Sequence, residues 1–135
     1  MSKQFTLGKD ERLKSRKLIE QLFKEGKSFV IAPFRVYYMI STAPSETTKP
    51  VNLQFGVGVS TKNFKKAVDR NRVKRVTKEA WRLQKLSLQQ ITKEQNKQLN
   101  VFLIYTSRDL PVYKEVNDKA GKILNKLGNI IAPIT

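Results

Sequence analysis

The sequence of 135 residues is long enough for one domain with a hydrophobic core and short for two. Lysine and arginine outnumber aspartate and glutamate by 27 to 11, so the formal net charge is +16. Because the chain has no cysteine and no histidine, disulfides, thiolate catalysis, zinc sites built on Cys or His, and the most common general base are excluded.

The first predicted element is a helix over residues 10–26, which Gly26 would end. Its apolar stripe at helical spacing consists of Leu18, Ile19, Leu22 and Phe23. The sequence FRVYYMI (34–40), rich in β-branched and aromatic residues, then predicts a strand. One face of this strand would carry Phe34, Val36, Tyr38 and Ile40, and the other would carry Arg35, Tyr37 and Met39. Prolines and hydroxyl residues over 41–50 predict a loop.

A second predicted strand, LQFGVGVS (53–60), has an unusual alternation. Phe55, Val57 and Val59 share one face, while Gly56 and Gly58 leave the other face bare. Something can approach the backbone closely at a bare face. Two explanations remain open, because either a ligand or a neighbouring side chain could fill the space.

The second half of the chain predicts a helix over 64–86, a polar connector over 87–100 that is helical in part, and a strand at VFLIYTS (101–107). The nearly continuous apolar run predicts that this strand is buried on both faces. A last helix over about 112–130 would bury Val116, Ala120, Ile123, Leu124, Leu127 and Ile130. The order helix, strand, strand, helix, strand, helix predicts an α+β fold, with about three helices packed against a small mixed sheet.

The most informative stretch is DRNRVKRVTKEAW (69–81), which lies in the predicted 64–86 helix. At helical spacing, the stripe that would face the core consists of Val73, Val76, Ala80 and Leu83. The opposite arc carries Lys74, Arg75, Lys78, Arg82 and Lys85. Residues 62–85 hold ten basic and two acidic side chains, which is half of the net charge in under a fifth of the chain.

A solvated surface helix is the simplest interpretation of such a charge run. A self-sufficient surface helix, however, pairs its cations with acids three or four residues away, and only Asp69 and Glu79 are available. The guanidinium fork suits phosphate oxygens, and asparagine both donates and accepts hydrogen bonds. The Arg-Asn-Arg triplet at 70–72 therefore indicates a surface that binds nucleic acid.

The total charge also predicts a polyanionic partner, because a surplus of this size repels itself in the folded state. A membrane is not expected as partner, since no apolar run approaches the roughly 20 residues of a spanning helix. The N-terminus MSKQFTLGKDER is charged where a signal peptide needs its apolar region. We therefore expect a cytoplasmic nucleic-acid-binding protein.

The basic helix and the strand before it resemble a known signature. The run FGVGVSTKNFKKAVDRNRVKRVTKEAWR is similar to that of the bacterial ribonuclease P protein family, whose hallmark is Arg-Asn-Arg followed by Lys-Arg. Upstream, ERLKSRKLIEQLFKEGKSF and FRVYY resemble the first helix and first strand of that family. The resemblance implies a single RNA-binding domain over residues 1–135 and a left-handed βαβ crossover, as in the ribosomal protein S5 domain 2-like fold. The general rule favours right-handed connections, so this handedness is expected from the resemblance alone.

The resemblance also implies a function. Proteins of this family are accessory subunits of an endoribonuclease whose RNA removes the 5′ leader from precursor tRNA with bound Mg²⁺. The expected partners are therefore the catalytic RNA and precursor tRNA, without DNA, and we expect the RNA to hold most of the Mg²⁺. A sequence without an evident catalytic constellation agrees with this role.

The family pattern, extended along the basic stretch, gives two groups of candidate residues. Those expected to bind the RNA subunit are Lys62, Lys66, Arg70, Asn71, Arg72, Lys74, Arg75 and Lys78. Those expected to form a cleft for the leader are Ile19, Phe23, Arg35 and Tyr37. Many family members have an aromatic ring where this chain has Ile19, which can pack against a base but cannot stack on it. Ile19 and Phe23 also fit an ordinary core stripe, so both interpretations remain open for them.

Two other functions compete with this one. A structural RNA-binding protein, such as a ribosomal protein, needs only the basic surface and has no role in cleavage. A DNA-binding helix-turn-helix protein fits less well, because the basic helix is followed by a long polar connector and is not preceded by a tight helical turn.

Overall fold

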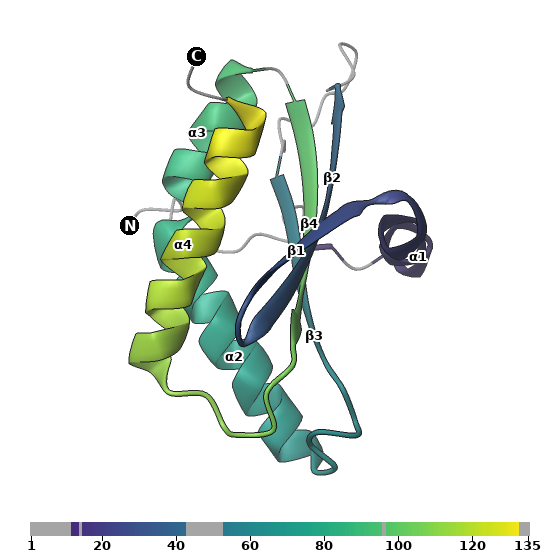
Figure 1. The fold of residues 1–135 in the computed structure, drawn as a ribbon, viewed down its shortest axis with the longest axis vertical. Helices are drawn as coiled ribbons and strands as arrows, with labels where there is room; N and C mark the ends of the chain where they lie inside the picture. Colours follow the sequence, from purple (N-terminus) through teal and green to yellow (C-terminus); the bar gives the residue numbers. More distant parts are fainter. Residues whose placement is uncertain (1–11, 14, 43–52, 96, 133–135) are drawn as a thin grey trace.

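A computed structural model describes residues 12–132 except 14, 43–52 and 96. The described part contains four helices and a four-stranded sheet (Figure 1). In chain order the elements are α1 (Arg16–Glu25), β1 (Lys27–Ile31), β2 (Phe34–Thr42), β3 (Leu53–Val59), α2 (Ala67–Gln84), α3 (Leu86–Glu94), β4 (Lys97–Tyr105) and α4 (Tyr113–Ile131). The predicted α+β class is confirmed, with one strand and one helix more than expected.

The strands lie in the order β1-β2-β4-β3. β1 and β4 both run antiparallel to β2, whereas β3 runs parallel to β4, so the sheet is mixed as predicted. Parallel neighbours need a crossover connection, and here α2 and α3 provide it. The handedness of this crossover stays a prediction from the family resemblance.

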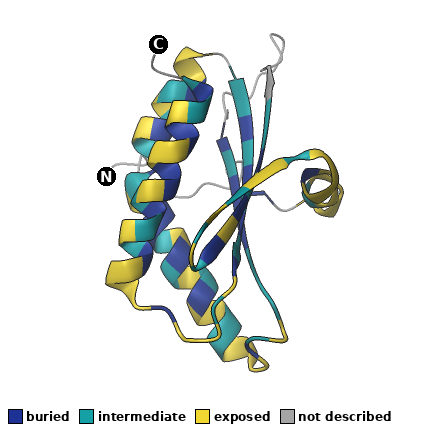
Figure 2. Ribbon diagram, viewed as in Figure 1, coloured by how far each residue is buried: buried dark blue, intermediate teal, exposed yellow. Residues whose placement is uncertain are grey.

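The sheet separates two helical layers of unequal size. α2, α3 and α4 cover one face, and α1 lies alone on the other (Figure 1). Buried positions gather between the larger layer and the sheet (Figure 2). The predicted alternation of β2 is confirmed, because Phe34, Val36 and Tyr38 are buried in this core whereas Arg35 is exposed. Among the described residues, α1 is the only helix packed on that face.

The first predicted helix is shorter than expected and is followed by a strand that was not predicted. α1 begins after Ser15, whose hydroxyl accepts a hydrogen bond from the Leu18 amide, and it ends at Gly26 as predicted. β1 is an edge strand without a fully buried residue, and Val30 is 59% exposed. Such a short strand has almost no hydrophobic pattern of its own, and its order comes from pairing with β2.

Two predictions in the second half of the chain are wrong in extent. The polar connector over 87–100 is mostly α3, and β4 already begins at Lys97 and ends at Tyr105. β4 also buries only one face fully, because Phe102 and Ile104 on the other face are half-buried.

The core stripe of α2 is rotated relative to the prediction. Val73 and Ala80 are fully buried, but Val76 is half-buried and Leu83 is 43% exposed. Thr77 and Trp81 take the remaining core positions, at 1% exposure each. The Trp81 ring stacks on Phe55 of β3, with 4.2 Å between centroids and 13° between planes. The largest apolar side chain of the helix therefore decides which face turns inward.

Candidate nucleic-acid interface

The outer face of α2 presents most of the predicted cations, but Lys85, which was expected on this arc, is buried at 1% exposure. Asn71, Arg72, Arg75 and Lys78 are exposed, and Lys74 is half-buried. Of the two acids on the helix, Glu79 is engaged by Arg82, whose Nε lies 3.2 Å from Glu79 Oε2. This hydrogen bond raises the pKa of the Arg82 guanidinium above its ordinary value. Arg82 therefore neutralises Glu79, and the face around Arg72 and Arg75 remains strongly positive.

Arg70 differs from its neighbours on α2. It is half-buried, and its Nη1 donates to the carbonyl oxygens of Phe64 and Lys65, at 2.8 Å each. Sequence reasoning placed Arg70 with the other RNA-binding cations, but in the structure one end of its guanidinium is turned toward the chain's own backbone.

Three aromatic rings form an open cluster on the α1 side of the sheet. The centroid of Phe23 on α1 lies 4.8 Å from that of Tyr37 on β2 and 5.6 Å from that of Phe102 on β4, both edge to face. Phe23 is 44% exposed, so it is not an ordinary core residue. Arg35 lies on the same sheet face as Tyr37, two residues away, and is exposed. The structure thus brings the predicted aromatic residues together beside a cation.

Phe102 explains the bare glycine face of β3. A Cβ added at Gly56 would lie 2.8 Å from the Phe102 ring, and one at Gly58 would lie 2.9 Å from it. Of the two open explanations, the neighbouring side chain is the correct one. Sequence reasoning missed Phe102 because the apolar run around it suggested plain burial, although the two glycines already indicated a close neighbour.

A cavity of about 280 Å³ connects the aromatic cluster with α2. Its lining residues come from the segment before α1 and from α1, β3, α2 and β4: Arg12, Leu13, Ile19, Phe55, Gly56, Val57, Lys74, Lys78 and Phe102. Ile19 is half-buried and faces this cavity, so the cleft interpretation fits it better than plain core. Lys74 and Lys78 belong to the predicted RNA-subunit group, yet they share the cavity with Ile19. The two predicted surfaces are therefore continuous.

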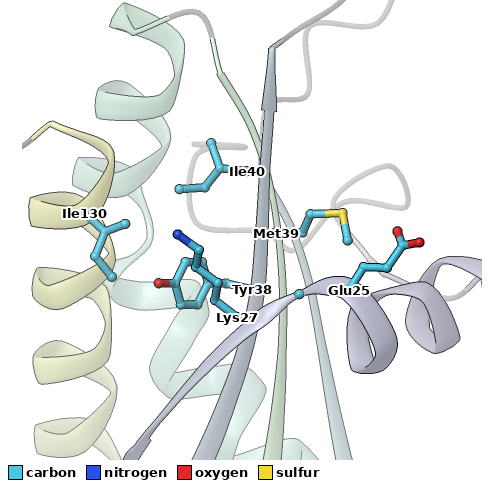
Figure 3. A pocket seen from close by; sticks show the side chains of 7 residues that line it. Glu25, Lys27, Tyr38, Met39, Ile40 and Ile130 are labelled. Atoms are coloured by element: carbon cyan, nitrogen blue, oxygen red, sulfur yellow. The ribbon is translucent and has the colours of Figure 1, made fainter.

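A second cavity, of about 210 Å³, lies near the C-terminal ends of α1 and α4 (Figure 3). Its lining residues are Glu25, Gly26, Lys27, Tyr38, Met39, Ile40 and Ile130. None of the predicted site residues lines it, and the carboxylate of Glu25 offsets the charge of Lys27. This cavity is the weaker candidate for a polyanion.

Within the described ranges, no three or more Asp or Glu side chains lie together in a way that could hold a metal ion. No helix in this part of the chain has the length and apolar character needed to cross a membrane.

Comparison with known proteins points in one direction. The Ribonuclease P family model matches residues 7–128. The ribonuclease P protein component of Porphyromonas gingivalis is 37% identical over 127 residues, which cover 93% of this chain and 90% of that protein. The ribonuclease P protein component of Chlorobium phaeobacteroides is 36% identical over 83 residues, which cover 62% of this chain and 56% of that protein.

Solved structures share the fold. The RNase P protein of Staphylococcus aureus superposes with a TM-score of 0.62 at 22% identity, covering 86% of this chain and 94% of that one. The RNase P protein of Thermotoga maritima gives a TM-score of 0.53 at 25% identity, covering 93% and 98%. With the Arg-Asn-Arg helix in its predicted place and the family match spanning most of the sequence, the chain belongs to the ribonuclease P protein family.

Proposed function

We propose that the protein binds the catalytic RNA of ribonuclease P through the exposed face of α2, and the 5′ leader of precursor tRNA through the cleft beside α1. The observation that carries this proposal is the continuity of the two surfaces, since Lys74 and Lys78 of α2 line the same cavity as Ile19 of α1. One protein can then hold an RNA subunit and its substrate side by side.

The α2 face suits a folded RNA. Arg72 and Arg75 are exposed, and the guanidinium groups can contact phosphate oxygens in pairs. Asn71, directly before Arg72, is also exposed and can bond a base edge or a 2′-hydroxyl. Together these groups supply charge where the phosphates of a folded RNA crowd, which lowers the Mg²⁺ concentration that the RNA needs.

The cleft suits a single strand. The rings of Phe23 and Tyr37 are partly accessible and lie near Arg35, and the cavity beyond them is bordered by Lys74 and Lys78. Stacking on aromatic rings combined with phosphate attraction binds single-stranded RNA with little sequence preference. A leader bound there favours precursor over mature tRNA, because the mature product has no leader to bind.

In this proposal the RNA carries out phosphodiester hydrolysis and holds the Mg²⁺, while the protein binds and orients. The chain has no histidine or cysteine to serve as general base or nucleophile. The reaction would take place in the cytoplasm, where precursor tRNA is made.

The test is cleavage of a precursor tRNA by a bacterial ribonuclease P RNA at low Mg²⁺, with and without this protein. Binding of long-leader and leaderless substrates is measured in the same samples. The proposal expects stimulated cleavage, and tighter substrate binding only when the leader is present. Tight binding to the RNA subunit without stimulation would instead support a structural RNA-binding protein.

A further inference from the structure

The loop between β3 and α2, residues 60–66, is fixed at several points. The carbonyl oxygen of Ser60 accepts hydrogen bonds from the amides of Asn63 and Phe64, at 3.2 Å each. The side-chain amide of Asn63 donates to the Thr106 carbonyl beyond β4, at 3.3 Å. Phe64 is 6% exposed, and its ring lies 6.1 Å from that of Tyr105. These contacts therefore hold the loop in one defined conformation against the rest of the fold.

The loop carries three exposed lysines, Lys62, Lys65 and Lys66. They lie at the N-terminal end of α2, beside the exposed Arg72 face, and Lys66 is the N-cap residue of the helix. Three cations on a backbone held by these hydrogen bonds give the loop a concentrated positive charge. Sequence reasoning included Lys62 and Lys66 but missed Lys65.

Arg70 secures this loop from within α2. Its Nη1 donates to two successive carbonyls, those of Phe64 and Lys65, and its backbone amide bonds the Lys66 carbonyl at 3.2 Å. One terminal nitrogen of a guanidinium has two N–H groups, so these contacts use both of them. The side chain therefore fixes the peptide units that orient Lys65 and Lys66.

We propose that Arg70 is a positioning residue: it holds the 60–66 loop so that Lys62, Lys65 and Lys66 bind RNA phosphates, and it does not itself contact a phosphate. This inference rests on the proposed function. Its physical basis is preorganisation, because cations already held in place lose less conformational entropy when RNA binds.

The salt dependence of binding separates positioning from direct contact. Each phosphate contact adds about 0.7 to 0.9 to the magnitude of the log-log salt slope. We expect R70A to raise the Kd for the ribonuclease P RNA about tenfold with the wild-type slope, because the lysines still reach phosphates but from a less ordered loop. The matched control is R72A, an exposed arginine of the same motif, which should lower the slope by about 0.7 to 0.9.

A double-mutant cycle tests the link to the loop. K65A should weaken binding in the wild-type background and much less in the R70A background, because Lys65 is already poorly placed there. R70K keeps the charge but loses the planar fork, so we expect its Kd to stay close to that of R70A. Circular dichroism and thermal melts confirm that each variant is folded, and R70K remains a test if R70A is unstable.

The outcomes are distinct. Three results would each overturn the positioning role while leaving the proposed function intact. The first is a salt slope that falls in R70A as much as in R72A. The others are wild-type affinity in R70K and additive effects of R70A and K65A on the free energy of binding. A wild-type protein that binds ribonuclease P RNA no better than an unrelated folded RNA would overturn both.

Discussion

Tyr37 occupies the point where aromatic and charged groups of the cleft meet. Its ring packs edge to face against Phe23, and Arg35 is exposed on the same strand face. Phe102, which fills the space above Gly56 and Gly58, is the third ring of the cluster around Phe23. Tyr37 thus belongs to the surface proposed for the leader and does not line the cavity that Lys74 and Lys78 of α2 border.

Replacing Tyr37 with alanine should reduce the preference for precursor over mature tRNA. We expect a loss of about five- to tenfold, because base stacking on one ring contributes on the order of 1–3 kcal/mol and Phe23 remains in place. Affinity for the RNA subunit should be unchanged. The measurement is the Kd of the reconstituted holoenzyme for both tRNA forms.

The conservative control is Tyr37→Phe, which keeps the ring and should retain most of the preference. Equal weakening of precursor, mature tRNA and RNA-subunit binding by Y37A would contradict the division of the protein into two RNA surfaces.

At the scale of elements, α2 combines a core face with the face proposed to bind RNA, and its orientation depends on Trp81. The stacked Phe55–Trp81 pair anchors the helix to β3, while Leu83, expected in the core, is 43% exposed. The cations on the opposite arc are directed by the same anchor. A change in the buried face should therefore lower stability, because it weakens the packing that holds α2 against β3.

The rotated stripe predicts a sharp contrast between two substitutions. Trp81→Ala should lower the free energy of unfolding by about 3–5 kcal/mol, because it empties a fully buried site. Leu83→Ala should change it by at most about 0.5 kcal/mol. Urea unfolding followed by circular dichroism measures both. Tryptophan fluorescence cannot be used, because Trp81 is the only tryptophan and the Trp81→Ala variant lacks it. Similar losses in the two variants would mean that Leu83 belongs to the core after all.

Sequence reasoning predicted the elements with strong periodicity, namely α1, β2, β3, α2 and α4, and brought Phe23 and Tyr37 into one cluster. It could not find β1, whose order comes from its partner strand, or the extent of α3, whose polar sequence resembles a connector. It also could not see Arg70 turned toward the loop, because a hydrogen bond to a backbone carbonyl leaves no trace in residue type.

At the scale of the whole molecule, the net charge of +16 acts on folding and on binding in opposite directions. Like charges repel within the free protein, so salt that screens them stabilises the fold. The same salt weakens binding to RNA, because the counterions that the RNA releases gain less entropy when they enter a solution already rich in salt.

We therefore expect the melting temperature of the free protein to rise with NaCl while its affinity for ribonuclease P RNA falls. With about six phosphates neutralised, the log-log slope is about −4 to −5, so raising salt from about 50 to about 200 mM weakens binding by about 250- to 1000-fold. Thermal melts and filter binding over one salt series measure both. A slope near zero would rule out phosphate contacts as the main source of affinity.

The position of β4 in the sheet has a consequence for folding of the protein during its synthesis on the ribosome. β4 is the last strand in the sequence, yet it lies between β2 and β3 and is the partner of both. Until residue 105 has emerged, β2 has only β1 beside it, and β3 lacks its neighbour in the sheet. The sheet can therefore close only late in translation, and a nascent chain that stops before β4 has β3 and α2 without the strand that joins β3 to the rest of the sheet.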